Sequence, residues 1–303
     1  MADRIEVTVI VDNYIDIFLP PTTVASYPSP GNESRLLAEQ GLSLWVKVST
    51  GQRVTQLLYD FGRSENVFAH NARILGLDIT RLDHLVLSHG HVDHYGALGR
   101  VMKETADRCK LFVHPVALTS KRCFQLPDGT FIGPWGMERR LLEDFSERIH
   151  ARSEPSMLAP DIYISGAIAR KTAFEHGMTG AFVETGGGLV HDDIPDDQAL
   201  YMDLEGKGIV VLTGCCHSGL INTIMKGQEL FPDRRIYAVL GGFHLNSVDQ
   251  RQMNATLDHL AQLDVAYIGS LHCTGYYAQK VLMERFEAGW IPGTVGLTVT
   301  LKS

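Results

Sequence analysis

Several features that define common protein classes are missing from these 303 residues. No apolar run approaches the ~18 residues that a membrane-spanning helix requires, so we expect no membrane segment. Basic residues are not in excess, because 27 Lys and Arg are outnumbered by 35 Asp and Glu, which gives a net charge of −8. This balance argues against a protein whose surface follows a phosphate backbone, and we expect no nucleic-acid partner.

Cysteine is scarce, with five residues, two of which are adjacent at positions 215 and 216. An odd number with this spacing does not suit a disulfide framework. The first residues lack the basic start, apolar run and small-residue cleavage site of a secretory signal. We therefore expect a reducing, cytoplasmic location. The Gly-x-Ser-x-Gly motif of serine hydrolases is absent as well, so the sequence does not favour that chemistry.

The apolar pattern predicts an α/β protein in which strands and helices alternate. Strands are predicted at 5–11, 42–49, 54–59, 85–88, 111–113, 199–203, 209–212, 236–240, 265–269 and 297–301. Helices are predicted at 66–75, 95–107, 220–230, 248–263 and 276–287. The less periodic segment around 120–160 is interpreted as an insertion with one helix at 137–145. Because no linker or repeat divides the chain, we expect one domain over residues 1–303.

Histidine is abundant, with 13 residues, and three of them share one short motif. The motif is Ser-His-Gly-His-Val-Asp-His at 88–94, directly after a predicted buried strand. Residues i and i+2 of an extended segment point the same way, so His89 and His91 can bind one metal ion. Asp93 and His94 fall where the chain turns into a helix and project to a neighbouring point. Two such ligand sets suit a dinuclear site, whereas the alternative is a solvated turn with Asp93 as a helix cap.

More candidate ligands follow strands in the second half of the chain. His217, His244 and His272 each come directly after a predicted strand. Ligands collect at the carboxyl ends of strands in open α/β sheets, so we expect these residues to approach the first motif. His217 and His272 are predicted to bind metal, and His244 to contact substrate or to act as a general acid. Asp60, at the end of another strand, could support a ligand histidine through a hydrogen bond, and the alternative is an aspartate that only forms the turn.

Other positions have weaker claims on the site. Cys215 or Cys216 could provide a thiolate ligand, although both could instead be small buried residues. Asp12 and Asn13 end the first strand and could face the same sheet edge. The backbone N–H groups of Ser218 and Gly219 open a predicted helix and could receive an anion. His191 is a further candidate ligand, but it lies in an acidic loop.

These motifs resemble those of the metallo-β-lactamase superfamily. His-x-His-x-Asp-His is similar to the superfamily's metal motif, and it starts at His89. Thr-Gly-Cys-Cys-His-Ser-Gly, Gly-Gly-Phe-His-Leu and His-Cys-Thr-Gly, at 213–219, 241–245 and 272–275, resemble one group of its metal-dependent hydrolases. That group includes 7,8-dihydropterin-6-yl-methyl-4-(β-D-ribofuranosyl)aminobenzene-5′-phosphate synthases. The resemblance covers nearly the whole chain and implies a four-layer αββα sandwich with the site at one sheet edge.

One departure from the superfamily concerns the residue that bridges its two metals. Most of its hydrolases have Thr-Gly-Asp where this chain has Thr-Gly-Cys at 213–215. A thiolate at Cys215 or Cys216 could replace the carboxylate, or the second metal could be bound weakly.

The expected function is metal-assisted hydrolysis or group transfer. His89, His91 and His217 would hold one divalent ion, and Asp93, His94 and His272 the other. Nitrogen-rich ligation favours zinc, with manganese and iron left open. The resemblance implies a small phosphorylated or pterin-like anion as substrate, with a lactone, thioester or β-lactam as the alternative. A non-catalytic metal-binding or redox-sensing protein is the alternative from another class. The sequence does not indicate an oligomeric state.

Overall fold

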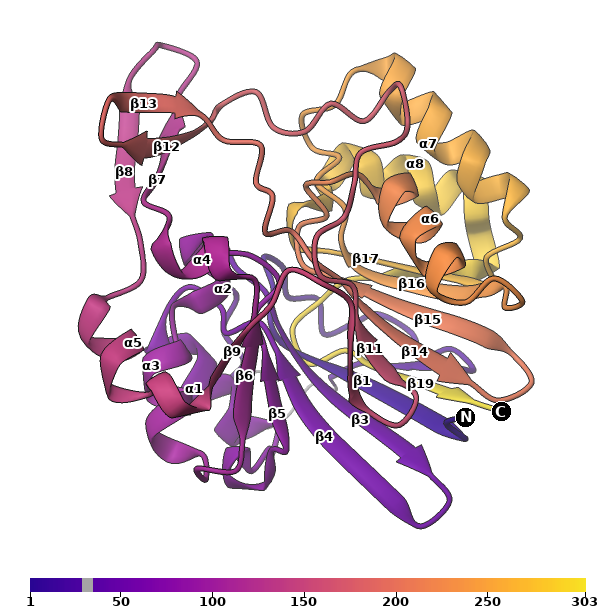
Figure 1. Ribbon diagram of the computed structural model, residues 1–303. Coiled ribbons are helices and arrows are strands. Elements are labelled where there is room, and N and C mark those ends of the chain that lie inside the picture. Colours follow the sequence, from indigo (N-terminus) through magenta and orange to yellow (C-terminus); the bar gives the residue numbers. More distant parts are fainter. Residues whose placement is uncertain (29–34) are drawn as a thin grey trace.

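The computed structural model describes residues 1–28 and 35–303, and within them the strands form sheets of eight, seven and four strands (Figure 1). The eight-stranded sheet has the order β2-β19-β1-β3-β4-β5-β6-β9. Its strands are β1 (Arg4–Val11), β2 (Ala25–Ser26), β3 (Ser43–Thr50), β4 (Arg53–Tyr59), β5 (His84–Val86), β6 (Lys110–Val113), β9 (Ile149–Ala151) and β19 (Thr298–Lys302). β3 and β4, which correspond to the strands predicted at 42–49 and 54–59, form a hairpin around Gly51.

Strand direction in this sheet brings several chain segments to one edge. β1 and β4 both pair antiparallel with β3, and β5 and β6 continue parallel to β4. β1, β4 and β5 therefore run in the same direction. Their carboxyl ends, which lead into Asp12, Asp60 and the histidine motif, lie at the same edge.

The seven-stranded sheet repeats this arrangement in the second half of the chain, in the order β10-β11-β14-β15-β16-β17-β18. Its strands are β10 (Ser156–Ala159), β11 (Ile162–Ile164), β14 (Leu200–Leu204), β15 (Gly208–Thr213), β16 (Ile236–Gly242), β17 (Tyr267–Leu271) and β18 (Trp290–Pro292). β15, β16, β17 and β18 are parallel neighbours. The segments that follow β15, β16 and β17 carry His217, His244 and His272 to one edge of the sheet.

Side-chain alternation along the strands explains how the layers pack. Ile5 and Val7 of β1 and Val210 and Leu212 of β15 belong to one apolar core, which lies between the two large sheets. The intervening Val211 points outward into a second core, with α6 (Leu220–Leu230), α7 (Gln250–Gln262) and α8 (Tyr276–Phe286). A third core joins the other sheet to α1 (Glu65–Ile74) and α3 (Leu98–Glu104). Successive residues of a strand face opposite sides, so three cores give the predicted αββα layers.

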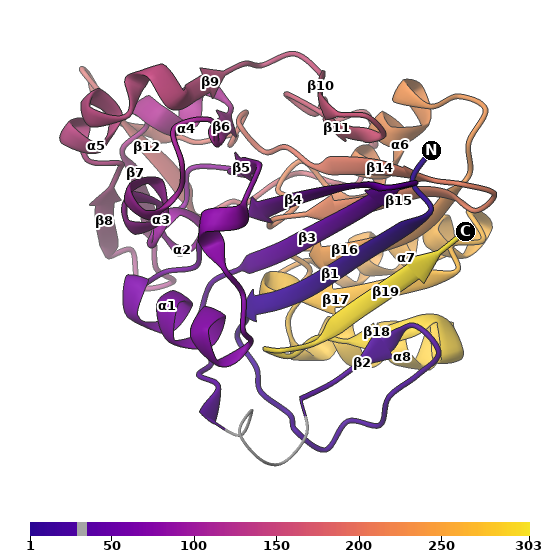
Figure 2. The ribbon, with the colours of Figure 1, turned by 90° about the horizontal axis from the view of Figure 1, so that it is seen from below.

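The figures show the same arrangement. α6, α7 and α8 cover the outer face of the seven-stranded sheet in Figure 1. Figure 2 shows β4, β3, β1 and β19 side by side, and both views place the two chain ends close together. Shorter helices complete the chain: α2 (Val92–Tyr95), α4 (Pro115–Thr119), α5 (Arg139–Asp144), η2 (Ile79–Arg81), η3 (Ser146–Arg148), η4 (His272–Thr274) and η5 (Glu287–Gly289). No helix of the described residues is long and apolar enough to cross a lipid bilayer.

The third sheet is the main feature that the sequence pattern does not predict. It contains β7 (Arg122–Gln125), β8 (Phe131–Trp135), β12 (Ala181–Thr185) and β13 (Gly188–His191), in the order β13-β12-β7-β8. In Figure 1 it stands at the upper left, away from the two large sheets. The segment around 120–160 contains the predicted helix as α5, but its β9 and β10 join the large sheets. In place of the single helix predicted over 95–107, the chain forms two shorter helices, α2 and α3, and the second ends at Glu104.

A buried arginine provides a test of how this fold is held together. Arg148 is 5% exposed and donates to the backbone carbonyls of Met102, Thr105 and Cys109, which tie the end of α3 to β6 and β9. We expect Arg148→Met to lower the free energy of unfolding by about 3 kcal/mol, because these buried carbonyls would lose their donor. Urea denaturation followed by circular dichroism would measure the change. Arg139→Met is the matched control, since that side chain is 91% exposed and its loss should change stability by less than about 0.5 kcal/mol. Equal losses in both variants would contradict this role of Arg148.

Candidate metal centre

The histidine motif lies between the end of β5 and the start of α2. His89 is buried in the extended part of this loop, and His91 immediately precedes the helix. Their side chains face each other, with 2.9 Å between His89 Nε2 and His91 Nδ1. Asp93 and His94 lie in the single turn of α2 and so point to a neighbouring position. The local geometry therefore divides the motif into two pairs, as its spacing predicts.

His217 completes a first group with His89 and His91. It comes from the loop after β15, in the other large sheet, and its Nε2 lies 3.2 Å from His91 Nδ1. One ring nitrogen from each of the three residues falls within 4.8 Å of the others. Burial lowers the pKa of all three rings, to about 4 for His91. Neutral imidazoles keep the lone pairs that metal ligation requires.

Asp93, His94 and His272 form a second group beside the first. His272 Nε2 lies 3.5 Å from an Asp93 carboxylate oxygen, and His94 Nε2 lies 4.0 Å from the other oxygen. Burial alone would raise the pKa of Asp93, but the neighbouring His94 and His272 lower it to about 2. The carboxylate is therefore ionised, as a metal ligand would be.

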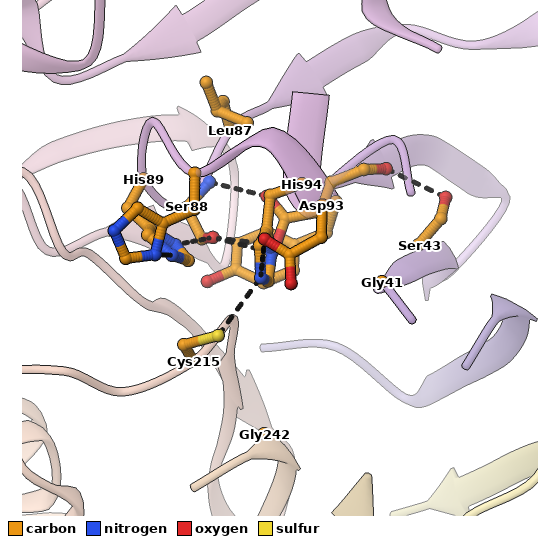
Figure 3. Close-up of polar contacts among 12 residues, drawn as sticks. Gly41, Ser43, Leu87, Ser88, His89, Asp93, His94, Cys215 and Gly242 are labelled. Atoms are coloured by element: carbon orange, nitrogen blue, oxygen red, sulfur yellow. Dashed lines mark hydrogen bonds and ion pairs between the residues drawn. The ribbon is translucent and has the colours of Figure 1, made fainter. Parts of the chain in front are cut away.

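Cys215 lies between the two groups, and Cys216 does not. The Cys215 sulfur is 3.1 Å from His94 Nε2, and a dashed line joins the two atoms in Figure 3. The sulfur lies within 4.8 Å of one donor atom each from His89 and His94. It also lies within 4.8 Å of donor atoms from His272 and Cys273. Cys216 has a left-handed backbone, with φ 63°, and its sulfur instead contacts Thr223 Oγ1 at 3.1 Å. Cys216 packs in the apolar core under α6, as the alternative of a small buried residue predicts.

His244 also reaches this region, whereas His191 does not. The His244 ring centroid lies 4.5 Å from that of His217, and one of its nitrogens groups with Cys215 and His217. Burial would lower the pKa of His244, but contact with the Cys273 sulfur raises it above its ordinary value. His191 lies at the end of β13 on the third sheet and forms an exposed pair with Asp193 at 3.6 Å.

Asp60 holds the first motif in place from the end of β4. Its Oδ2 lies 2.6 Å from His94 Nδ1, and its two oxygens accept hydrogen bonds from the backbone N–H and the hydroxyl of Ser88, both at 2.7 Å. Burial would lower the pKa of His94, but Asp60 raises it to about 9. With this pKa the ring of His94 carries a proton on both nitrogens at neutral pH. Asp60 holds the proton on Nδ1, and a metal ion would have to displace the proton on Nε2, which is directed at Cys215.

Asp12 and Asn13 have the same role toward His272. The Asp12 carboxylate accepts the backbone N–H of His272 at 2.7 Å, and the Asn13 side-chain oxygen lies 2.9 Å from His272 Nδ1. His272 Nε2, on the other side of the ring, is buried without a hydrogen-bond partner. A buried nitrogen of this kind is costly unless something binds it. The donor set and this unpartnered atom both fit a divalent ion.

The acidic loop before β14 contributes three residues that sequence reasoning did not assign. Asp192, Asp196 and Asp197 are all buried. Asp196 accepts the backbone N–H of Gly90, inside the histidine motif, at 2.8 Å, and Asp197 accepts that of Ser218 at 2.8 Å. The sequence does contain a signal for these residues. Four aspartates lie within six residues, and so many charges in one loop need partners.

The expected anion site at Ser218 and Gly219 is already filled from within the chain. Besides the bond from Ser218 to Asp197, the Glu175 carboxylate accepts the N–H groups of Ile221 and Asn222 at 2.8 and 2.9 Å. Glu175 is 3% exposed, and its carboxylate caps the start of α6. An incoming phosphate would meet these carboxylates, and the expectation of an anion site here is wrong.

Comparisons with known proteins find related sequences and a related fold. A family model described as the metallo-β-lactamase superfamily matches residues 52–108. A 7,8-dihydropterin-6-methyl-4-(β-D-ribofuranosyl)-aminobenzene-5′-phosphate synthase of Methanocaldococcus jannaschii is 31% identical over 288 residues, which cover 91% of this chain and 93% of that protein. A second, uncharacterised protein of the same organism is 29% identical over 267 residues, 87% of this chain and 95% of that protein. The crystal structure of a metal-dependent hydrolase of the β-lactamase superfamily has the same fold, with a TM-score of 0.76 at 22% identity over 99% of this chain and all of that one.

Asp60 allows a test that separates ligand orientation from folding. Asp60→Asn keeps the side-chain shape, but its amide can present an N–H to His94 where the carboxylate presents an oxygen. We expect divalent-metal affinity to fall about 10- to 100-fold, measured by competition with a chromogenic chelator. Asp161→Asn is the control, because Asp161 has a similar left-handed backbone, with φ 66° against 61° for Asp60, and pairs with the chain's N-terminal amine. Unchanged metal affinity in Asp60→Asn would rule out the proposed orientation.

Proposed function

This chain belongs to the metallo-β-lactamase superfamily, and we propose that it is a hydrolase or group-transfer enzyme with a dinuclear metal centre that acts on a small phosphorylated or pterin-like anion. The observation that carries the proposal is the meeting of two donor groups at one sheet edge. His89, His91 and His217 form one group, and Asp93, His94 and His272 form the other. Neighbouring sets of nitrogen and oxygen donors are the arrangement that two-metal hydrolytic sites use.

Each donor group would hold one divalent ion, and Cys215 would lie between the ions. Bound ions would supply an activated water and polarise the electrophilic oxygen of the substrate. Asp93, ionised because its pKa is lowered to about 2, would accept a hydrogen bond from the attacking water. The Cys215 sulfur occupies the position where most members of the superfamily carry an aspartate, and sulfur ligation favours zinc among the candidate metals.

His244 is the proposed proton donor to the leaving group. Its ring is beside His217, its Nδ1 is buried without a hydrogen-bond partner, and its pKa is raised by Cys273. A histidine whose pKa is raised and whose ring lines the cleft can deliver a proton to the departing oxygen.

The nature of the substrate is inferred from the relative and from one arginine. The synthase relative is named for a phosphate-bearing product with a pterin ring. A cleft of about 510 Å³ adjoins the donor groups, and both Arg63 and Arg122 line it. Arg122 is neutralised by Asp192 and Asp196, whereas Arg63 has no ion pair among the described residues. Arg63 is therefore the cation available to a phosphate in this cleft.

The decisive experiment combines metal analysis with a substrate panel. We expect protein purified without added metal to contain about two divalent ions per chain by elemental analysis and to hydrolyse phosphate esters in preference to lactones. His89→Ala should lose at least one of these ions and lower kcat by at least about 100-fold, because one ligand of three is removed. His259→Ala, an exposed histidine on α7, is the matched control and should change neither. If the purified wild-type protein contains no divalent metal and hydrolyses no ester, the proposal is wrong. If it hydrolyses lactones but no phosphate esters, the alternative substrate class is favoured.

The role of Arg63 is tested separately. We expect Arg63→Ala to raise the KM for phosphate esters about tenfold with little change in kcat, since a charge-assisted contact to the substrate is lost. Arg63→Lys should recover part of this loss because it keeps the charge without the planar fork. The KM of any uncharged ester should not move. If KM for phosphate esters is the same in the alanine variant, another group binds the phosphate.

A further inference from the structure

The cleft beside the metal centre has a second wall, which the third sheet provides. β7 pairs with β12 so that Phe124 is opposite Ala181, and β7 pairs with β8 so that Phe124 is opposite Ile132. Residues that are directly opposite on neighbouring strands project to the same face of a sheet. Ala181, Phe124 and Ile132 therefore form one apolar row across three strands, and all three line the cleft.

This row does not serve a hydrophobic core. None of its residues belongs to the three cores formed by the described residues, and the same holds for Trp135, which also lines the cleft. Ile132 is 39% exposed. The opposite face of the sheet has its own contact, in which the rings of Phe131 and Phe182 pack edge to face with centroids 5.1 Å apart. Apolar side chains that face a cleft without covering a core are characteristic of ligand sites.

A buried ion cluster fixes the position of this wall relative to the metal centre. Arg122 begins β7, two residues before Phe124, and donates to Asp192 at 2.6 Å and to Asp196 at 2.9 and 2.5 Å. Asp196 also accepts the N–H of Gly90. A Cβ on Gly90 would lie 2.7 Å from the Arg122 guanidinium, so the two chain segments are in direct contact. The wall is thus attached to the histidine motif through charged groups that are buried and paired.

We propose that the row formed by Ala181, Phe124 and Ile132, together with Trp135, is a binding platform for a planar aromatic or pterin-like ring of the substrate. The inference rests on the proposed function, because it places the ring on the third sheet while the anionic end faces the donor groups and Arg63. Flat rings stack on aromatic side chains in offset or edge-to-face arrangements, and short aliphatic phosphates have no such face. The third sheet therefore determines which phosphate esters the enzyme accepts.

Two probes separate the ring from the phosphate: 6-methylpterin carries a ring without phosphate, and glycerol 3-phosphate carries phosphate without a ring. We expect Phe124→Leu to weaken binding of 6-methylpterin about tenfold in a ligand-observed NMR titration. The KM of phenyl phosphate should rise by a similar factor with kcat unchanged, and the KM of glycerol 3-phosphate should stay constant. Phe124→Tyr keeps the ring and should retain wild-type values.

Phe131→Leu is the matched control, because Phe131 is on the same sheet but outside the cleft. It should bind 6-methylpterin like the wild type. Failure of the wild-type protein to bind 6-methylpterin, or equal effects of the Phe124→Leu and Phe131→Leu substitutions, would overturn the platform. Loss of ring binding in Phe124→Leu alone would support it even if no phosphate ester is hydrolysed. If metal-dependent hydrolysis is found but the KM depends neither on a ring in the ester nor on Phe124, the proposed function is upheld and the platform is rejected.

Discussion

Packing of the two large sheets against one shared apolar core determines where every candidate ligand lies. The core takes alternate side chains from β1, β3, β4 and β19 on one side and from β11, β14, β15 and β16 on the other. Once these faces are joined, the carboxyl ends of β4 and β5 meet those of β15, β16 and β17. Both proposed ligand groups need the two sheets, because His89, His91, Asp93 and His94 follow β5 of one sheet, whereas His217 and His272 follow strands of the other. The candidate metal centre is thus a consequence of how apolar surface is buried.

Buried charge organises the same edge. Asp60 bonds His94 and Ser88, while Arg122 is held between Asp192 and Asp196. Removing one partner of such a pair leaves an uncompensated charge away from water, which typically costs about 3–5 kcal/mol. Each pair connects segments that are distant in the sequence, so each fixes one loop relative to another. The histidines that face the first candidate ion stay neutral because burial opposes their charge.

Much of this arrangement follows from local patterns. The strand at 209–212 and the helix at 220–230 are where the apolar periodicity places them, as β15 and α6. The spacing of His89, His91, Asp93 and His94 predicts two pairs of side chains, because their directions depend only on one strand end and one helical turn. The third sheet has no comparable signal. β7 and β12 are short and pair with each other although about 55 residues lie between them, so no local window of sequence contains this pairing.

The sequence by itself determined the family motifs, the order of the elements and the residues that end each parallel strand. Tertiary structure decided that Cys215 rather than Cys216 faces the donor groups, because a left-handed backbone at Cys216 turns that side chain into the core. It also decided that Asp192, Asp196 and Asp197 are buried partners of Arg122 and of backbone amides, and that Phe124 faces the cleft. The physical reason is that the spacing of residues along the sequence specifies the relative directions of their side chains only within one helix or strand. Which distant side chains meet depends on strand register and sheet packing, which the whole chain sets together.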